Sequence, residues 1–135
     1  MELKMEVGTV HEVNVTVEEN MTAVSMKSGS LQVFATPYMI AIMEQASAEL
    51  CQQFLPEGIS TVGTMVNIQH LAATSLGAPV RAVATLKDFD GRKASFEVVA
   101  YDNAGVIGKG THERFTIKVE SFLKKTQERK SVVAE

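Results

Sequence analysis

One segment limits what this chain can fold into more than any other: between Thr36 and Leu55, only Glu44 and Glu49 carry charge. Apolar side chains recur through it at the spacing of one helical face: Met39, Ile42, Met43, Ala46, Leu50 and Phe54. A helix with so little polar surface has to be covered on most sides. We therefore expect it to lie buried against a sheet.

Capping and turn residues mark the two ends of this helix. Thr36 is suited to accept a backbone N–H at the N-cap, and Pro37 suits the first helical position, where its missing N–H is not needed. Pro56 and Gly58 predict that the helix ends close to them.

Five other segments show the alternation of apolar and polar residues that is typical of half-buried strands. They cover residues 7–17, 59–72, 80–89, 93–101 and 106–119. One face of the second segment holds Val62, Val66, Ile68 and His70. One face of the third holds Val80, Ala82, Ala84 and Leu86, and the inward face of the fourth holds Ala94, Phe96, Val98 and Ala100. Tight turns join the last three segments, and residues 120–130 predict a short amphipathic helix.

The order of these elements predicts an α+β fold, in which an antiparallel sheet of about five strands wraps around one long central helix. That arrangement is the hot-dog fold. Such a sheet leaves strand edges free, and proteins usually manage free edges by pairing them. We therefore expect a homodimer, or a higher oligomer, that continues the sheet.

Composition fits a single domain over residues 1–135, because 45% of the residues are hydrophobic and 21% are charged. The net charge of −3 argues against nucleic acid as a partner, since phosphate binding needs a basic surface. No apolar run reaches the ~18 residues of a membrane span, so no membrane partner is expected. One cysteine, Cys51, and an N-terminus without an apolar signal segment predict a cytoplasmic location.

The sequence lacks the motifs of several common enzyme classes. It has no nucleophile elbow, no phosphate-binding loop and no dinucleotide fingerprint. His11-Glu12 and His112-Glu113 lack the second histidine of a zinc-binding helix, so neither a metal nor another cofactor is expected. Any activity must come from ordinary acid–base and hydrogen-bonding groups.

Three residues are candidates for such chemistry, and each has a structural alternative. Glu44 lies in an uncharged stripe of the helix, so it is either an acid–base group or a side chain that reaches a wet edge or pairs with an arginine. His70 could transfer protons, although a lone histidine on an apolar face is more often a core or rim residue. Thr36 is explained by capping alone, but it stands beside free N–H groups that can stabilise an oxyanion.

Thr36 and Glu44 cannot meet directly within one helix, because their separation in sequence corresponds to about 12 Å along the helix axis. If both act on one substrate, either the substrate lies along the helix or a partner chain supplies one of them. Both alternatives favour a site at a dimer seam.

Five short segments form a specific combination: Val33-Phe34-Ala35-Thr36, Met43-Glu44, Gly63-Thr64 through His70, Ala72-Ala73-Thr74, and Gly108-x-Gly110-Thr111-His112-Glu113-Arg114. In these segments and their spacing, the chain resembles the fluoroacetyl-CoA thioesterase group of hot-dog proteins, over roughly residues 33–118. The resemblance implies a homodimer that hydrolyses an acyl-CoA thioester, with CoA present only as part of the substrate. It implies a catalytic set of Thr36, Glu44 and His70, and it places Gly63 and Arg114 near the substrate.

In one respect this chain departs from that group. The group has an aromatic-rich stretch just ahead of the threonine, thought to cover the acyl group, whereas residues 26–30 here contain no aromatic side chain. We therefore expect a short or medium acyl group other than fluoroacetyl.

The resulting hypothesis is thioester hydrolysis without a metal. Backbone N–H groups at the helix start, with Gly63, would polarise the carbonyl. Glu44 would act as general base on water or as nucleophile, and His70 would move a proton and assist departure of the CoA thiolate. Thr36 would position the carbonyl or water, or, less favourably, carry the acyl group. Arg114 would meet a CoA phosphate, or lie on the outer sheet face as a solvated charge.

Two rival functions fit the same fold. A non-catalytic acyl-CoA-binding module would bind the thioester without releasing a thiol. A hot-dog dehydratase or hydratase would need an acid–base pair beside the acyl β-carbon, and the sequence shows no second Asp–His pair suited to that reaction. A shared fold does not separate these functions, whereas thiol release does.

Overall fold

The structure, a computed structural model, describes residues 2–132. Its elements are, in order, β1 (Val10–Thr16), a 3-10 turn (Glu19–Met21), α1 (Thr36–Gln52), β2 (Ile59–His70), β3 (Pro79–Phe89), β4 (Lys93–Asp102), β5 (Gly105–Lys118) and α2 (Val119–Lys130). All five expected strands and both expected helices are therefore present. The long helix ends at Gln52, earlier than the expected end near Pro56.

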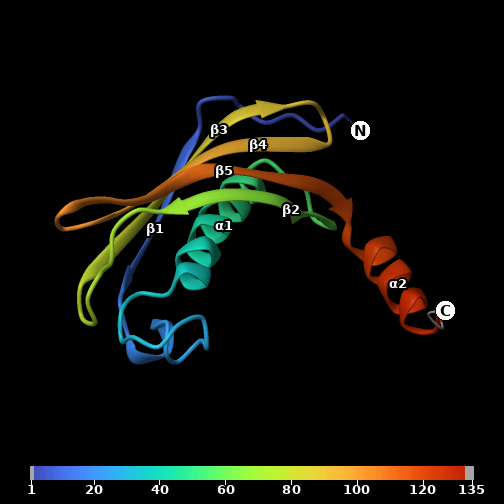
Figure 1. Ribbon diagram of the computed structural model, residues 1–135. Helices are drawn as coiled ribbons and strands as arrows, with labels where there is room; N and C mark the ends of the chain where they lie inside the picture. Colours follow the sequence, from blue (N-terminus) through green and yellow to red (C-terminus); the bar gives the residue numbers. More distant parts are fainter. Residues whose placement is uncertain (1, 133–135) are drawn as a thin grey trace.

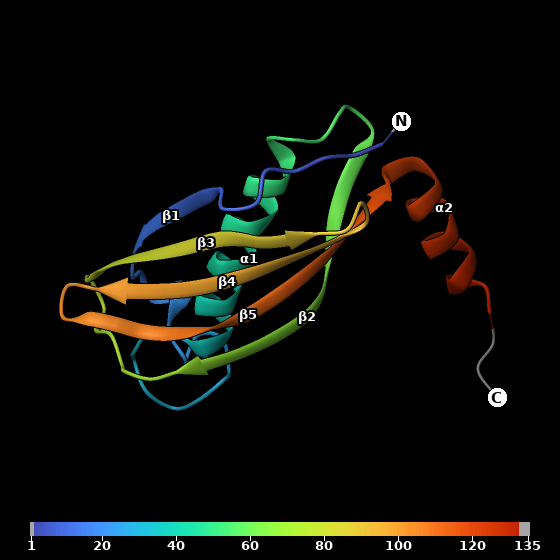
Figure 2. The ribbon, with the colours of Figure 1, turned by 90° about the horizontal axis from the view of Figure 1, so that it is seen from above.

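The five strands form one antiparallel sheet in the order β1-β3-β4-β5-β2. The sheet curls around α1, which lies along its concave side (Figures 1 and 2). Strands β1 and β2 form the two edges of this sheet. The expected arrangement of an antiparallel sheet around one long helix is thus confirmed.

The core lies between α1 and the concave face of the sheet. The buried side chains of α1 include Met39, Ile42, Met43, Ala46 and Leu50. They pack against the inward residues of the central strands, which are Val80, Ala82, Ala84 and Leu86 of β3 and Ala94, Phe96, Val98 and Ala100 of β4. The predicted inward faces of these two strands are therefore correct.

The start of α1 differs from the sequence prediction by one residue. Ala35 is the N-cap, with extended backbone angles of φ −75° and ψ 137°, so Thr36 is the first helical residue and Pro37 the second. The prediction that Thr36 caps the helix was therefore wrong. Its hydroxyl is hydrogen-bonded to the His70 ring instead.

A β-bulge in β2 changes which residues face the helix. Gly63 pairs with Arg114 and Met65 pairs with Glu113, so Thr64 is the extra residue. Because side chains alternate between the two faces of a strand, this insertion places both Gly63 and His70 on the face toward α1. The prediction that Val62 shares a face with His70 was therefore wrong.

Two glycines of β5 are required by close packing. A Cβ atom on Gly108 would lie 2.5 Å from the Met39 sulfur, and one on Gly110 would collide with the β2 backbone at Asn67 and Ile68. The Gly108-x-Gly110 motif therefore lets β5 approach both α1 and β2, a packing role unrelated to phosphate binding.

Helix α2 projects away from the end of the sheet (Figure 1), and its residues are exposed or half-buried. No helix within residues 2–132 has the length and apolar character needed to cross a membrane.

The packing at Gly110 gives a test of the fold. We expect Gly110→Ala to lower the free energy of unfolding by about 2 kcal/mol, because the new methyl group meets backbone atoms that cannot move without disturbing the β2–β5 pairing. Thr111→Ala, at the exposed neighbouring position of the same strand, is the matched control. Urea unfolding curves that place the two variants at equal stability would contradict this account.

Candidate active site

The first candidate group joins the start of α1 to the end of β2. The Thr36 Oγ1 and the His70 Nδ1 lie 2.7 Å apart and form a hydrogen bond. His70 reaches this position because it is the last residue of β2 and lies on the face toward the helix. Two of the predicted catalytic residues are therefore in direct contact, although they are far apart in sequence.

The His70 ring combines burial with an unused polar atom. Its Nε2 atom is buried and finds no hydrogen-bond partner among residues 2–132. Burial lowers the pKa of His70 from its ordinary value of 6.5. The ring is therefore neutral at pH 7, so it can exchange a proton with Thr36 or with a bound molecule.

A hollow of about 230 Å³ opens beside this pair. It is lined by Ala23, Ser28, Val33, Phe34, Thr36, His70, Leu71, Ala72 and Ala73. The lining side chains that come from the loop before α1 are small or aliphatic, apart from Phe34, which belongs to the core. The hollow therefore offers a modestly sized space, with a mixed polar and apolar lining, next to the hydroxyl and the imidazole.

The second candidate group surrounds Glu44, further along α1. Its side chain is 41% exposed, and its Oε2 atom lies 3.7 Å from the Arg114 Nη1. Glu44 thus shows both structural alternatives that the sequence suggested, because its side chain reaches solvent and also lies beside an arginine. A carboxylate in this position is reachable by a bound molecule and is held beside a positive charge.

Arg114 lies on the inward face of β5, where it pairs with buried Ala94 and is only 8% exposed. Its Nε donates to the Thr61 hydroxyl at 2.8 Å, and its Nη2 donates to the Thr61 carbonyl at 3.1 Å. The suggestion that Arg114 is a solvated charge on the outer face was therefore wrong. Its burial is tolerated because Thr61 and Glu44 supply acceptors.

Gly63 provides the space between these charged groups. A Cβ atom at this position would lie 2.7 Å from the Glu44 Oε2 and 3.2 Å from both the Arg114 Nη1 and the His112 Cε1. A larger residue here would displace the carboxylate. Gly63 therefore belongs to the same group as Glu44 and Arg114.

His112 is a member of this group that the sequence reasoning missed. It is 1% exposed, and its Nε2 lies 3.3 Å from the Arg114 Nη1. In the sequence it is half of an incomplete zinc motif and part of the segment from Gly108 to Arg114, and neither pattern assigns it a role. The signal that could have found it is its spacing of two residues from Arg114, which puts both side chains on the same face of a strand.

Cys51 lies close to this second group but is not a candidate nucleophile. The side chain is fully buried, and burial raises the pKa of its thiol to about 11. Because the thiolate is the reactive form, the thiol is inert near neutral pH.

The two groups remain separate within one chain. No hydrogen bond or ion pair in the described part of the chain links Thr36 or His70 to Glu44, Gly63 or Arg114. Residues 2–132 also contain no cluster of three or more potential metal ligands. The chemistry that the two groups offer is proton transfer and hydrogen bonding, on one side by a hydroxyl and an imidazole and on the other by a carboxylate.

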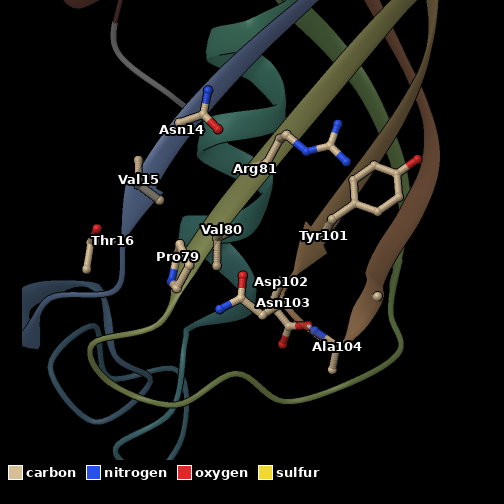
Figure 3. A pocket seen from close by; sticks show the side chains of 11 residues that line it. Asn14, Val15, Thr16, Pro79, Val80, Arg81, Tyr101, Asp102, Asn103 and Ala104 are labelled. Atoms are coloured by element: carbon tan, nitrogen blue, oxygen red, sulfur yellow. Dashed lines mark hydrogen bonds between the residues drawn. The ribbon is translucent and has the colours of Figure 1, made fainter.

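A larger hollow, of about 690 Å³, lies elsewhere on the sheet. Figure 3 shows its lining, which includes Asn14 of β1, Arg81 of β3 and Tyr101 of β4, with α1 behind the strands. The Arg81 guanidinium lies over the Tyr101 ring, 4.3 Å from its centroid. Size alone does not identify the site here, since the acid–base residues lie at the smaller hollow and around Glu44.

Known proteins match this chain in sequence. Residues 17–120 match the sequence model of a family described as fluoroacetyl-CoA-specific thioesterase. A curated fluoroacetyl-CoA thioesterase from Streptantibioticus cattleyicolor is 38% identical over 98 residues, which cover 73% of this chain and 70% of that protein.

Solved structures agree with the sequence matches. The structure of the fluoroacetyl-CoA thioesterase FlK is 32% identical, with a TM-score of 0.88, and the match covers 96% of this chain and 99% of that one. A hot-dog-like protein from Thermanaerovibrio acidaminovorans is 24% identical, with a TM-score of 0.86 over 96% of both chains. The predicted hot-dog fold is thus confirmed.

The inertness of Cys51 can be measured directly. We expect the native protein to react with a thiol reagent at pH 8 at least about 100-fold more slowly than a free cysteine, because the thiol is buried and little of it is ionised. After unfolding in denaturant, the same sample should take up one equivalent of reagent, since the chain contains one cysteine. Rapid modification of the native protein would contradict the burial described here.

Proposed function

The chain belongs to the fluoroacetyl-CoA-specific thioesterase family, and we propose that it hydrolyses a short or medium acyl-CoA to the free acid and CoA. The observation that supports this most is the bonded Thr36–His70 pair at the start of a helix that also carries Glu44. A hydroxyl, an imidazole and a carboxylate are groups suited to acyl transfer without a metal or other cofactor.

In the proposed reaction, Glu44 takes a proton from a water molecule, and the water oxygen forms a bond to the thioester carbon. The C–S bond then breaks, and the neutral His70 ring relays a proton to the departing CoA sulfur, because it takes up the proton that Glu44 removed from water and gives up its own. The N–H groups of the first turn of α1 stabilise the negative charge on the carbonyl oxygen, together with the backbone at Gly63. Arg114, which is buried beside Glu44, holds that carboxylate in position.

Thr36 positions the carbonyl or the water in this scheme. Its bond to His70 also meets the condition for an acyl-carrying nucleophile, since a base lies within 2.7 Å of its hydroxyl. Mass spectrometry of acid-quenched reactions separates these roles. An acyl adduct on Thr36 would show that Thr36 is the nucleophile. We expect no adduct, because we favour the positioning role.

We also propose that the active form is a homodimer joined through β2, which is an edge strand of the sheet. Val66 supports this, because it lies on the inward face of β2 and yet is 45% exposed. An antiparallel pairing of two β2 strands centred close to Val66 brings His70 of one chain opposite Gly63 of the partner subunit. Such a dimer combines the Thr36–His70 pair of one chain with the Glu44 group of the other.

The acyl group, in this proposal, occupies the hollow beside Thr36. The loop segment 24–32 next to it is exposed and holds no aromatic side chain that could close over a very small acyl group. A short or medium acyl chain therefore fits the site better than fluoroacetyl does. An acyl-CoA series of increasing chain length, compared by kcat/KM, tests this preference.

Thiol release should depend on Glu44 and His70. We expect purified protein to release free CoA from short or medium acyl-CoAs, and Glu44→Gln and His70→Ala each to lower kcat by about 10²–10⁴-fold while remaining folded. Glu49→Gln on the same helix and His11→Ala serve as matched controls, because these two residues pair with each other away from the candidate site. Full turnover by Glu44→Gln would show that the mechanism is wrong.

The same assay separates the rival functions. A non-catalytic binding module would bind acyl-CoA in a calorimeter but release no thiol. A hydratase would consume an unsaturated acyl-CoA without cleaving its thioester.

The acid side of the pH profile should reflect His70. Because burial lowers the pKa of His70, the neutral ring persists as the pH falls, and the ring becomes protonated only below 6.5. We therefore expect the acid-side midpoint of kcat/KM to lie below pH 6.5. An acid-side midpoint at or above pH 7 would be incompatible with a neutral, buried His70.

A further inference from the structure

His112 is a buried, polar side chain to which the proposed mechanism gives no task. Its ring lies in the core with 1% exposure and stacks on Phe96, with ring centroids 5.9 Å apart and an interplanar angle of 28°. Buried imidazoles need hydrogen-bond partners on both nitrogens, because an unpaired polar atom in the core is costly. Both ring nitrogens of His112 have such partners.

The partner of Nδ1 fixes where the ring proton lies. This atom is 2.7 Å from the carbonyl oxygen of Met65, and a carbonyl oxygen can only accept. Nδ1 therefore carries the proton, and in the neutral ring Nε2 presents a lone pair. That lone pair accepts an N–H from the Arg114 Nη1 at 3.3 Å.

The contact between His112 and Arg114 fixes the tilt of the guanidinium plane, which the other hydrogen bonds of Arg114 do not fix. Thr61 accepts from Nε and from Nη2, so both bonds end on one residue along one edge of the guanidinium. The planar group could still tilt about that edge. The bond from Nη1 to His112 fixes the tilt, and Nη1 is also the atom that lies 3.7 Å from the Glu44 carboxylate.

His112 is also joined to the bulge in β2. Met65, whose carbonyl accepts from Nδ1, is the first paired residue after the bulge, and Val66 pairs with His112 itself. One ring therefore links the strand that carries Gly63 to the guanidinium that faces Glu44. Because His112 is almost fully buried, it acts through these neighbours and does not itself meet the substrate.

We propose that His112 is a positioning residue, whose Nε2 holds the Arg114 guanidinium at the tilt that places the Glu44 carboxylate beside Gly63, where it activates the water that attacks the thioester. The proposal rests on the thioesterase function proposed above. It adds a positioning residue to Arg114 and the three residues of the catalytic set.

Two substitutions separate this role from a structural one. An asparagine side chain can place its amide N–H near the position of Nδ1, so His112→Asn keeps the bond to Met65 and loses the acceptor for Arg114. A glutamine side chain can place its carbonyl oxygen near the position of Nε2, so His112→Gln keeps the acceptor and loses the bond to Met65. His11→Asn is the control, since His11 lies at the other edge of the sheet and pairs with Glu49.

The measurements are kcat and KM for CoA release, together with melting temperatures. We expect His112→Asn to lower kcat by about tenfold to 100-fold with KM changed less than about threefold, because the carboxylate is misplaced while the binding surface remains. His112→Gln should keep a clearly larger share of kcat than His112→Asn. His11→Asn should match the wild type.

Other results would overturn the proposal. It fails if folded His112→Asn turns over like the wild type, if the two variants lose kcat equally and in step with melting temperature, or if neither variant folds. Should the wild type cleave no acyl-CoA, the proposed function fails, and the NMR signal of the Arg114 Nε–H then tests the positioning role alone. A shift of that signal in His112→Asn but not in His112→Gln supports the role, and equal spectra contradict it.

Discussion

The candidate site depends on one irregularity in one strand, the β-bulge at Thr64. Gly63 and His70 are an odd number of residues apart, so in a regular strand they would face opposite sides of the sheet. The extra residue brings both to the side of α1, with Gly63 beside Glu44 and His70 beside Thr36. Bulges re-aim side chains in this way next to active sites. Without the bulge, either Gly63 would no longer lie beside Glu44 or His70 would no longer lie beside Thr36.

The inward face of β5 supplies the other residues that the site needs. It carries glycines where β2 and α1 come close, and then His112 and Arg114 where the polar group is needed. A buried arginine is stable only if acceptors surround it, and here Thr61, His112 and Glu44 provide them. The same contacts that make the burial tolerable also hold the carboxylate, so fold stability and site geometry are coupled at this point.

Much of this structure could be predicted from the sequence, and the failures have physical causes. Hydrophobic periodicity correctly predicted α1 and the inward faces of β3 and β4, because apolar burial decides those elements. It could not reveal an inserted residue in β2, so Val62 was placed on the wrong face. It also could not indicate that polar His112 and Arg114 face the core, since their partners come from distant segments. Family resemblance supplied Gly63 and Arg114, which no periodic pattern would have selected.

The central claim is that one thioester is attacked by groups from two chains, the Thr36–His70 pair of one and the Glu44 group of the other. Heterodimers of a His70→Ala chain and a Glu44→Gln chain, purified through two different tags, test it most directly. Each parent homodimer lacks an essential group in both sites, whereas the heterodimer regains one complete site if the groups combine across the seam. The account predicts CoA release at about half the wild-type rate per dimer. Heterodimers no more active than their parents would contradict it.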